Sequence, residues 1–152
     1  MATRSAIAVM HGDRVKGCYI HWDGYPEGVG ATLINYYDVI KANQLVALGN
    51  VSSLGAEIGE QHPFSSLESE LSRDEYDGLY GNMTTFYGRD RGEDGQEYLS
   101  FASTEAFVNH YETMGCEYFY VMQDHAWKYT TGPDRPWRDL ANDLINQSES
   151  MA

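Results

Sequence analysis

Basic residues are scarce in this sequence, which has 10 Lys and Arg against 23 Asp and Glu. The formal net charge at pH 7 is therefore −13. A surface of this sign repels the phosphate backbone, which a general nucleic-acid-binding protein neutralises with Lys and Arg. The composition argues against direct nucleic-acid binding.

Cysteine is almost absent as well. The two cysteines, Cys18 and Cys116, lie far apart in the sequence, which excludes zinc ribbons and disulfide scaffolds. Both fall on expected strands, where a buried cysteine acts as a small hydrophobic residue. Cys18 and His21 are three residues apart and face opposite sides of a strand, so a local nucleophile and base are disfavoured.

Long apolar runs are also missing. No segment approaches the roughly 20 apolar residues that span a bilayer. The apolar run near the N-terminus is too short for the core of a signal peptide. We therefore expect no membrane association and take the reducing cytoplasm as the compartment.

The sequence is rich in Tyr and Gly, with 12 and 15 residues, and 42% of its residues are hydrophobic. This composition is typical of a globular protein with aromatic-rich strands and many tight turns. A chain of 152 residues has the size of one domain. We predict a single domain over residues 1–152, with a polar tail that frays at about 146–152.

Apolar periodicity and turn residues predict three hairpins, at residues 5–22, 84–101 and 116–131. Helices are expected after them, at 30–37, at 39–48 with Asp38 as its cap, after Ser103 and after Asp134. Hairpins favour antiparallel pairing. The predicted fold class is therefore α+β, an antiparallel sheet built from hairpins with helices packed mainly on one face.

Residues 55–81 differ from the rest of the chain in charge. They contain seven acidic residues and one basic residue, Arg73, and carry −6 of the net charge. Ser65 and Glu68 have the spacing of a capping box, which predicts a short surface helix at about 66–76. A mobile acidic insert is the alternative.

The densest cluster of polar and aromatic residues is His21-Trp22-Asp23-Gly24-Tyr25-Pro26. It lies where a strand ends and a loop begins, a common position for a site. His21 and Asp23 share a face and are the candidate catalytic residues, as metal ligands or as a base and its orienting carboxylate. Trp22 and Tyr25 are candidate contact residues. Alternatively the cluster is structural, with Trp22 in the core and Asp23-Gly24 starting a turn.

Local sequence identifies no metal site and no cofactor. The other histidines are scattered without the spacing of metal ligands: His11, His62, His110 and His125. The loop that starts at Asp90 fails as a calcium loop because Gly92 and Phe101 occupy its third and twelfth positions. The sequence has no phosphate-binding glycine loop, nucleophile elbow or His-Glu-x-x-His motif. A site assembled across space stays open.

Residues 5–9, 19–26 and 45–55 carry a resemblance, the second stretch reading Tyr19-Ile20-His21-Trp22-Asp23-Gly24-Tyr25-Pro26. They resemble a family of small phage- and prophage-encoded proteins of uncharacterised function. The hairpin at 118–121 with Trp127 is similar but less distinctive, and the acidic middle departs from the pattern. The resemblance implies a phage gene product acting inside a bacterial host, and it brings no reaction or cofactor.

The sequence favours a non-enzymatic protein of phage type that binds a host or defence component in the bacterial cytoplasm. Its candidate surfaces are the loop at 21–26 and the acidic segment. The expected contacts in that segment are Glu68, Glu70, Asp74 and Glu75. Two alternatives stay open: a metal-dependent hydrolase that uses His21 and Asp23, and a sponge for a small nucleotide, which the few basic residues disfavour. An exposed edge strand would also let two copies pair.

Overall fold

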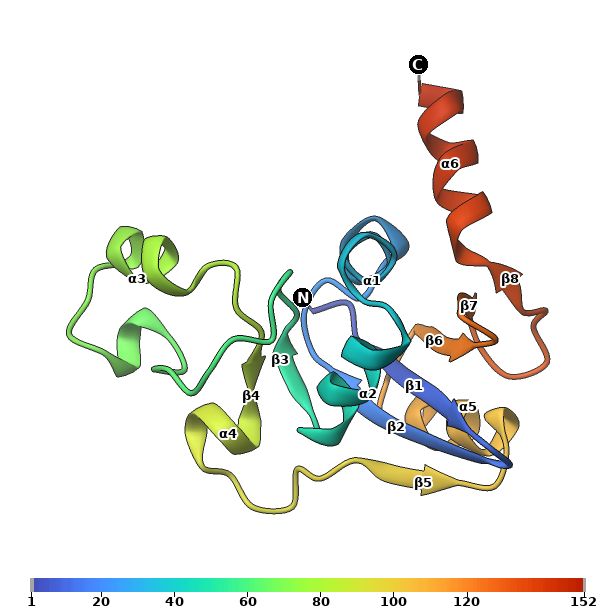
Figure 1. Ribbon diagram of the computed structural model, residues 1–152, viewed down its shortest axis with the longest axis horizontal. Coiled ribbons are helices and arrows are strands. Elements are labelled where there is room, and N and C mark those ends of the chain that lie inside the picture. Colours follow the sequence, from blue (N-terminus) through green and yellow to red (C-terminus); the bar gives the residue numbers. More distant parts are fainter. Residues whose placement is uncertain (1, 152) are drawn as a thin grey trace.

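The computed structural model describes the backbone of residues 2–151 and the side chains through residue 145 (Figure 1). The strands are β1 (Ser5–His11), β2 (Arg14–Ile20), β3 (Val51–Ser53), β4 (Thr85–Phe86), β5 (Leu99–Phe101), β6 (Tyr118–Gln123), β7 (Ala126–Thr130) and β8 (Arg138–Asp139). The helices are the π-helix η1 (Pro26–Gly30), α1 (Ala31–Tyr36), α2 (Val39–Ala47), the 3-10 turn η2 (Ser66–Glu68), α3 (Arg73–Tyr80), α4 (Tyr87–Arg91), α5 (Thr104–Glu112) and α6 (Leu140–Met151). The predicted frayed tail, 146–152, falls on residues whose side chains lie outside this description.

The strands form one sheet in the order β4-β3-β2-β1-β6-β7-β8, and β5 also pairs with β2. The α+β class is confirmed, but the sheet is mixed rather than purely antiparallel. β1–β2 and β6–β7 are antiparallel hairpins, whereas β1 runs parallel to β6 and β2 runs parallel to β3. The helices α1 and α2 make the crossover that returns the chain in the same direction for β3.

The hairpin predicted at residues 84–101 is wrong. β4 pairs with β3 and β5 pairs with β2, so the two predicted partners lie against different strands. The helix α4 begins directly after β4 and carries the chain away from it. A turn sequence between two apolar runs cannot show that each run has a better partner elsewhere in the sheet.

Alternating side chains of β1 point into two separate cores. Ile7 and Val9 join the core under α1, α2 and α6, where Leu33 and Leu45 are also buried. Ala6 and Ala8 face the opposite side, where Phe107 of α5 packs. Figure 1 shows α1 and α2 on the near side of the central strands and α5 on the far side. The helices thus lie mainly on one face, with α5 covering the other. Both cysteines are buried, and burial raises the pKa of the Cys116 thiol to about 12.

Two of the predicted helix starts are confirmed by their caps. The side chain of Asp38 accepts a hydrogen bond from the N–H of Lys41 (2.8 Å), and Ser103 accepts one from Ala106 (3.1 Å). The start predicted at Asp134 is wrong. Residues 138–139 pair with β7 as β8, and α6 begins after them.

The acidic segment, residues 55–81, connects β3 to β4 at one side of the sheet, on the left in Figure 1. The helix predicted at 66–76 is wrong, because only a 3-10 turn forms at Ser66–Glu68 and α3 starts at Arg73. The capping box uses Ser72 and Glu75 instead of Ser65 and Glu68. No helix in the described part of the chain is both long and apolar enough to cross a membrane.

Candidate functional site

Within the motif at residues 21–26, Trp22 combines a fixed backbone with an exposed side chain. The N–H of His21 donates to the carbonyl oxygen of Val51 (3.1 Å), and the N–H of Trp22 donates to that of Ser52 (3.0 Å). These bonds continue the pairing of β2 with β3 and fix the backbone at Trp22. The residue is nevertheless 46% exposed, although a tryptophan is usually mostly buried. The fold therefore holds a large apolar side chain in water.

The turn after Trp22 is a folding element. Asp23 adopts a left-handed backbone conformation with φ +58°, which reverses the chain. Gly24 is buried, and its carbonyl oxygen accepts a hydrogen bond from the hydroxyl of Tyr120 (2.7 Å). Pro26 is also buried, at the start of η1. The motif therefore divides into a buried turn and the exposed aromatic side chains that this turn positions.

The structure gives the two candidate catalytic residues separate partners. Nδ1 of His21 lies 2.7 Å from the Tyr19 hydroxyl, whereas Oδ1 of Asp23 accepts a hydrogen bond from the Tyr25 hydroxyl (3.3 Å). Burial, and then the charge of Arg4, lower the pKa of His21, so its ring is neutral at pH 7. The charge of Asp23 is the main cause that raises the pKa of Tyr25. Nowhere in the described part of the chain do three side chains of His, Cys, Asp or Glu gather as metal ligands.

A groove of about 800 Å³ opens beside Trp22, between β3, β4 and the acidic segment; we call it the Trp22 groove. Its apolar walls are Trp22, Phe64, Leu67, Leu71, Tyr76, Tyr80 and Met83. The polar residues that line it are Ser52, Ser53, Ser65, Ser66, Ser72 and Thr85, with Arg73 and Asp77 as its charged residues. A smaller hollow of about 290 Å³ that includes Asp23 and Glu27 is also lined by Trp22. Trp22 therefore stands between two concave surfaces.

A buried polar cluster, which sequence reasoning missed, holds the acidic segment against α4. The carboxylate of Asp90 is fully buried and accepts hydrogen bonds from the N–H groups of His62 (3.1 Å) and Phe86 (2.7 Å). The guanidinium of Arg89 donates to the same carboxylate at 3.0 Å. We call His62, Thr85, Arg89 and Asp90 the Asp90 cluster. Since a buried carboxylate is stable only with such partners, the cluster fixes one wall of the groove.

The Asp90 cluster also contains a hydroxyl beside an imidazole. Nε2 of His62 lies 3.2 Å from the Thr85 hydroxyl, and Nδ1 lies 2.7 Å from the carbonyl oxygen of Glu60. A hydroxyl, a histidine and a carboxylate in this order are the groups of a nucleophile, a base and an orienting acid. Here Thr85 is only 5% exposed and Arg89 neutralises Asp90. The contacts therefore serve to hold the segment in place.

The predicted contact residues of the acidic segment have different roles. Glu68 pairs with Arg91 (3.3 Å). Glu75 accepts a hydrogen bond from the N–H of Ser72 (3.1 Å), which is the main cause that lowers the pKa of that carboxyl. Glu70 and Asp74 are exposed, and no cation among the described residues pairs with them. The carboxylates of Glu70 and Asp74 thus remain free for a partner.

Tyr76 connects α3, one wall of the groove, to residues 63–64. The hydroxyl of Tyr76 donates to the carbonyl oxygens of Pro63 (2.8 Å) and Phe64 (3.0 Å). Burial is the main cause that raises the pKa of Tyr76. The ring of His62 stacks on Tyr80, with their centroids 5.1 Å apart. The aromatic lining of the groove is therefore continuous with the Asp90 cluster.

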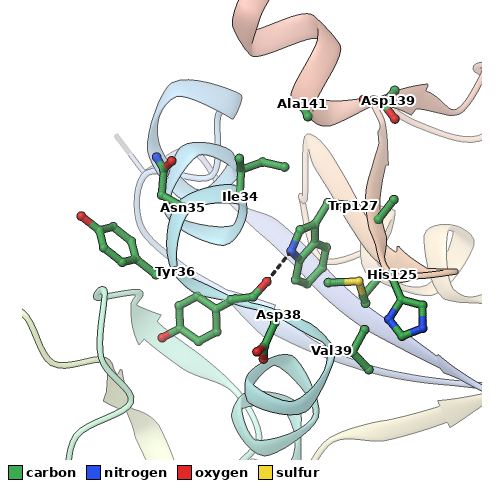
Figure 2. A pocket seen from close by; sticks show the side chains of 12 residues that line it. Ile34, Asn35, Tyr36, Asp38, Val39, His125, Trp127, Asp139 and Ala141 are labelled. Carbon is green, nitrogen blue, oxygen red and sulfur yellow. Dashed lines mark hydrogen bonds between the residues drawn. The ribbon is translucent and has the colours of Figure 1, made fainter.

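A further hollow of about 600 Å³ lies between α1, α2 and the β6–β7 hairpin, and Figure 2 shows it. Its floor includes Trp127, whose indole N–H donates to the carbonyl oxygen of Tyr37 (3.0 Å), the dashed line in Figure 2. The carboxylates at its rim already cap helices: Asp38 accepts from Lys41, and Asp139 accepts from Asn142 (2.9 Å). These polar groups have partners within the fold, and Trp127 is buried, whereas Trp22 is 46% exposed. We therefore take the Trp22 groove as the candidate site.

Comparisons of the chain with protein-family models, with curated proteins and with solved structures find no match.

Proposed function

We propose that this chain is a binding protein without catalytic activity, which engages a host or defence protein through the Trp22 groove. The observation that supports this most directly is Trp22, a residue that is 46% exposed beside two hollows while its backbone is fixed by β3. Tryptophan and tyrosine side chains presented in this way are frequent anchors of protein interfaces. The resemblance to phage- and prophage-encoded proteins supplies the setting, the cytoplasm of a bacterial host.

The geometry gives less support to the two alternatives. A metal-dependent hydrolase that uses His21 and Asp23 needs further ligands, and the described residues bring none to these two. A nucleotide sponge needs cations for its phosphates. The groove contains one, Arg73, which lies 3.9 Å from the carboxylate of Asp77. Pairing of two copies through an edge strand stays a prediction.

The test compares two tryptophan variants in affinity capture from bacterial lysate. Trp22→Ala removes the exposed indole beside the groove, and Trp137→Ala removes another exposed tryptophan, 39% accessible, before β8. We expect Trp22→Ala to reduce the enrichment of captured host proteins by about tenfold or more, as for an interface anchor. Trp137→Ala should capture as the unmodified protein does.

Circular dichroism spectra of both variants control for loss of the fold. The proposal is overturned if the unmodified protein enriches nothing beyond a folded protein of equal net charge. It is also overturned if the two variants capture the same proteins in equal amounts.

A further inference from the structure

We infer that the occupant of the Trp22 groove is a short, basic, amphipathic segment of the partner, with its apolar side chains in the groove and its Lys and Arg over the rim. This inference rests on the proposed function and specifies the chemistry of the partner. It is carried by three observations, namely the exposed apolar side chains of the groove, the unpaired carboxylates of the acidic segment that forms one of its sides, and the hydrogen bonds that hold its walls.

The groove presents apolar side chains that the fold itself does not cover. Leu67, on the 3-10 turn η2, is 94% exposed, and Trp22, which follows β2, is 46% exposed. Leu71, Phe64 and Met83 continue this lining. An apolar surface rimmed by polar residues marks a contact with another protein. A sugar or a free ion would leave Leu67 in water, whereas an apolar peptide side chain would cover it.

The charge around the groove is mainly negative. Its one lining cation, Arg73, lies 3.9 Å from the carboxylate of Asp77. The acidic segment carries −6, and Glu70, Asp74 and Glu75 have no cation partner among the described residues. Asp23 and Glu27 add carboxylates on the other side of Trp22. Like charges that face each other repel, and opposite charges speed association and fix the register of a complex. The occupant is therefore basic on the side that faces the rim.

The groove is also preformed. The buried carboxylate of Asp90 joins the acidic segment to α4, and the Tyr76 hydroxyl holds α3 to residues 63–64. A wall fixed in this way needs little ordering when a ligand binds, so the entropic cost falls on the ligand. A volume of about 800 Å³ accommodates several side chains of an extended or helical segment.

The experiment uses designed peptides as probes of the full chain. The first peptide places Leu along one helical face with Lys elsewhere, the second is its scrambled isomer, and the third has Glu in place of Lys. Binding is measured by calorimetry and by the change in tryptophan fluorescence. We expect the first peptide to bind about tenfold or more tightly than the isomer, and the acidic peptide not to bind.

Variants of the protein distinguish binding in the groove from attraction by the overall negative charge. Leu67→Ser is expected to weaken binding of the first peptide about tenfold, and the double variant Glu70→Gln, Asp74→Asn to weaken it several-fold. Glu75 is kept because it caps α3. The matched control is Glu105→Gln, Glu112→Gln, which removes two exposed charges from α5 on the far face of the sheet. The control should bind as the unmodified chain does.

The outcomes distinguish this inference from the proposed function. The inference is overturned if no peptide binds, or if the first peptide and its scrambled isomer bind equally. It is also overturned if the α5 control weakens binding as much as the double variant Glu70→Gln, Asp74→Asn does. Capture of host proteins through Trp22 would still support the proposed function in each of those cases. If capture is independent of Trp22 while the first peptide binds through Leu67, the proposed function fails and the groove alone is supported.

Discussion

The hydroxyl of Tyr120 donates a hydrogen bond across 2.7 Å to the carbonyl oxygen of Gly24, joining the middle of the sheet to the loop that carries Trp22. The Tyr120 side chain is completely buried on β6. Burial is the main cause that raises the pKa of its phenol, so the hydroxyl remains a donor at all physiological pH values. The loop is thereby anchored from a strand near the other end of the chain.

Replacing Tyr120 with Phe leaves the buried carbonyl oxygen of Gly24 without its donor. An unsatisfied buried acceptor costs about 1–3 kcal/mol, and we expect the free energy of unfolding to fall by this amount. Urea denaturation followed by circular dichroism measures it. Tyr36→Phe, at a side chain that is 53% exposed, is the matched control and should change nothing. Equal stability of the two variants would show that the bond does not anchor the loop.

Glycines at positions 24 and 78 should respond to alanine in opposite directions. A Cβ at Gly24 would lie 2.7 Å from Cβ of Ser5 and 2.8 Å from the carbonyl oxygen of Thr3, so Gly24→Ala should destabilise by about 1–3 kcal/mol. A Cβ at Gly78, inside α3, would meet nothing within 4 Å. Gly78→Ala should therefore stabilise by about 0.5–1 kcal/mol. Thermal and urea unfolding check both, and a neutral Gly24→Ala would contradict the structural role of the turn.

The elements that the sequence predicts correctly are those that depend on residues close together in the chain. The β1–β2 and β6–β7 hairpins and the caps at Asp38 and Ser103 are short-range features, and the sequence contains all their determinants. The parallel pairing of β1 with β6 depends on residues more than a hundred positions apart, so no window of sequence reveals it. The helix start predicted at Asp134 is wrong because residues 138–139 pair with β7 as a strand, and this pairing is also not visible in the local sequence.

The candidate site was predictable in part. The sequence predicts Trp22 as a contact residue, and Trp22 lines the groove. The interpretation of His21 and Asp23 as a pair came from their shared face on a strand, but the left-handed turn at Asp23 ends that alternation. The Asp90 cluster was missed because His62 and Asp90 are 28 residues apart, and neither has a motif that marks it.

Removing the charge of Asp90 should release the acidic segment. In Asp90→Asn the buried amide can no longer accept from the N–H groups of His62 and Phe86 and from Arg89 together. Breaking such a buried pair costs about 3–5 kcal/mol. We expect amide hydrogen exchange to accelerate first in residues 55–81, before β1 and β2. Asp94→Asn, in an exposed turn, is the control. If amide hydrogen exchange accelerated uniformly across the chain, Asp90 would not hold the acidic segment specifically.

Tyr37 should give the protein a measurable loss of stability at alkaline pH. Its hydroxyl donates to the carbonyl oxygen of Gly55 (2.8 Å), and burial is the main cause that raises the pKa of the phenol to about 12. In the unfolded chain the phenol ionises near pH 10. Between these two values the unfolded state has already lost the proton that the folded state keeps, so the folded state loses stability as the pH rises.

Tyr37→Phe cannot ionise and lacks this part of the pH dependence. At pH 8 the variant should be less stable than the unmodified protein by about 1–2 kcal/mol, because its hydrogen bond to Gly55 is gone. The difference should narrow between pH 10 and pH 12, where only the unmodified protein loses the contribution of Tyr37. The other buried tyrosines are present in both proteins, so their effects cancel. Urea denaturation at pH 8, 10 and 11 measures the gap. A gap that stays constant with pH would mean that the Tyr37 phenol ionises at the same pH in the folded and unfolded states.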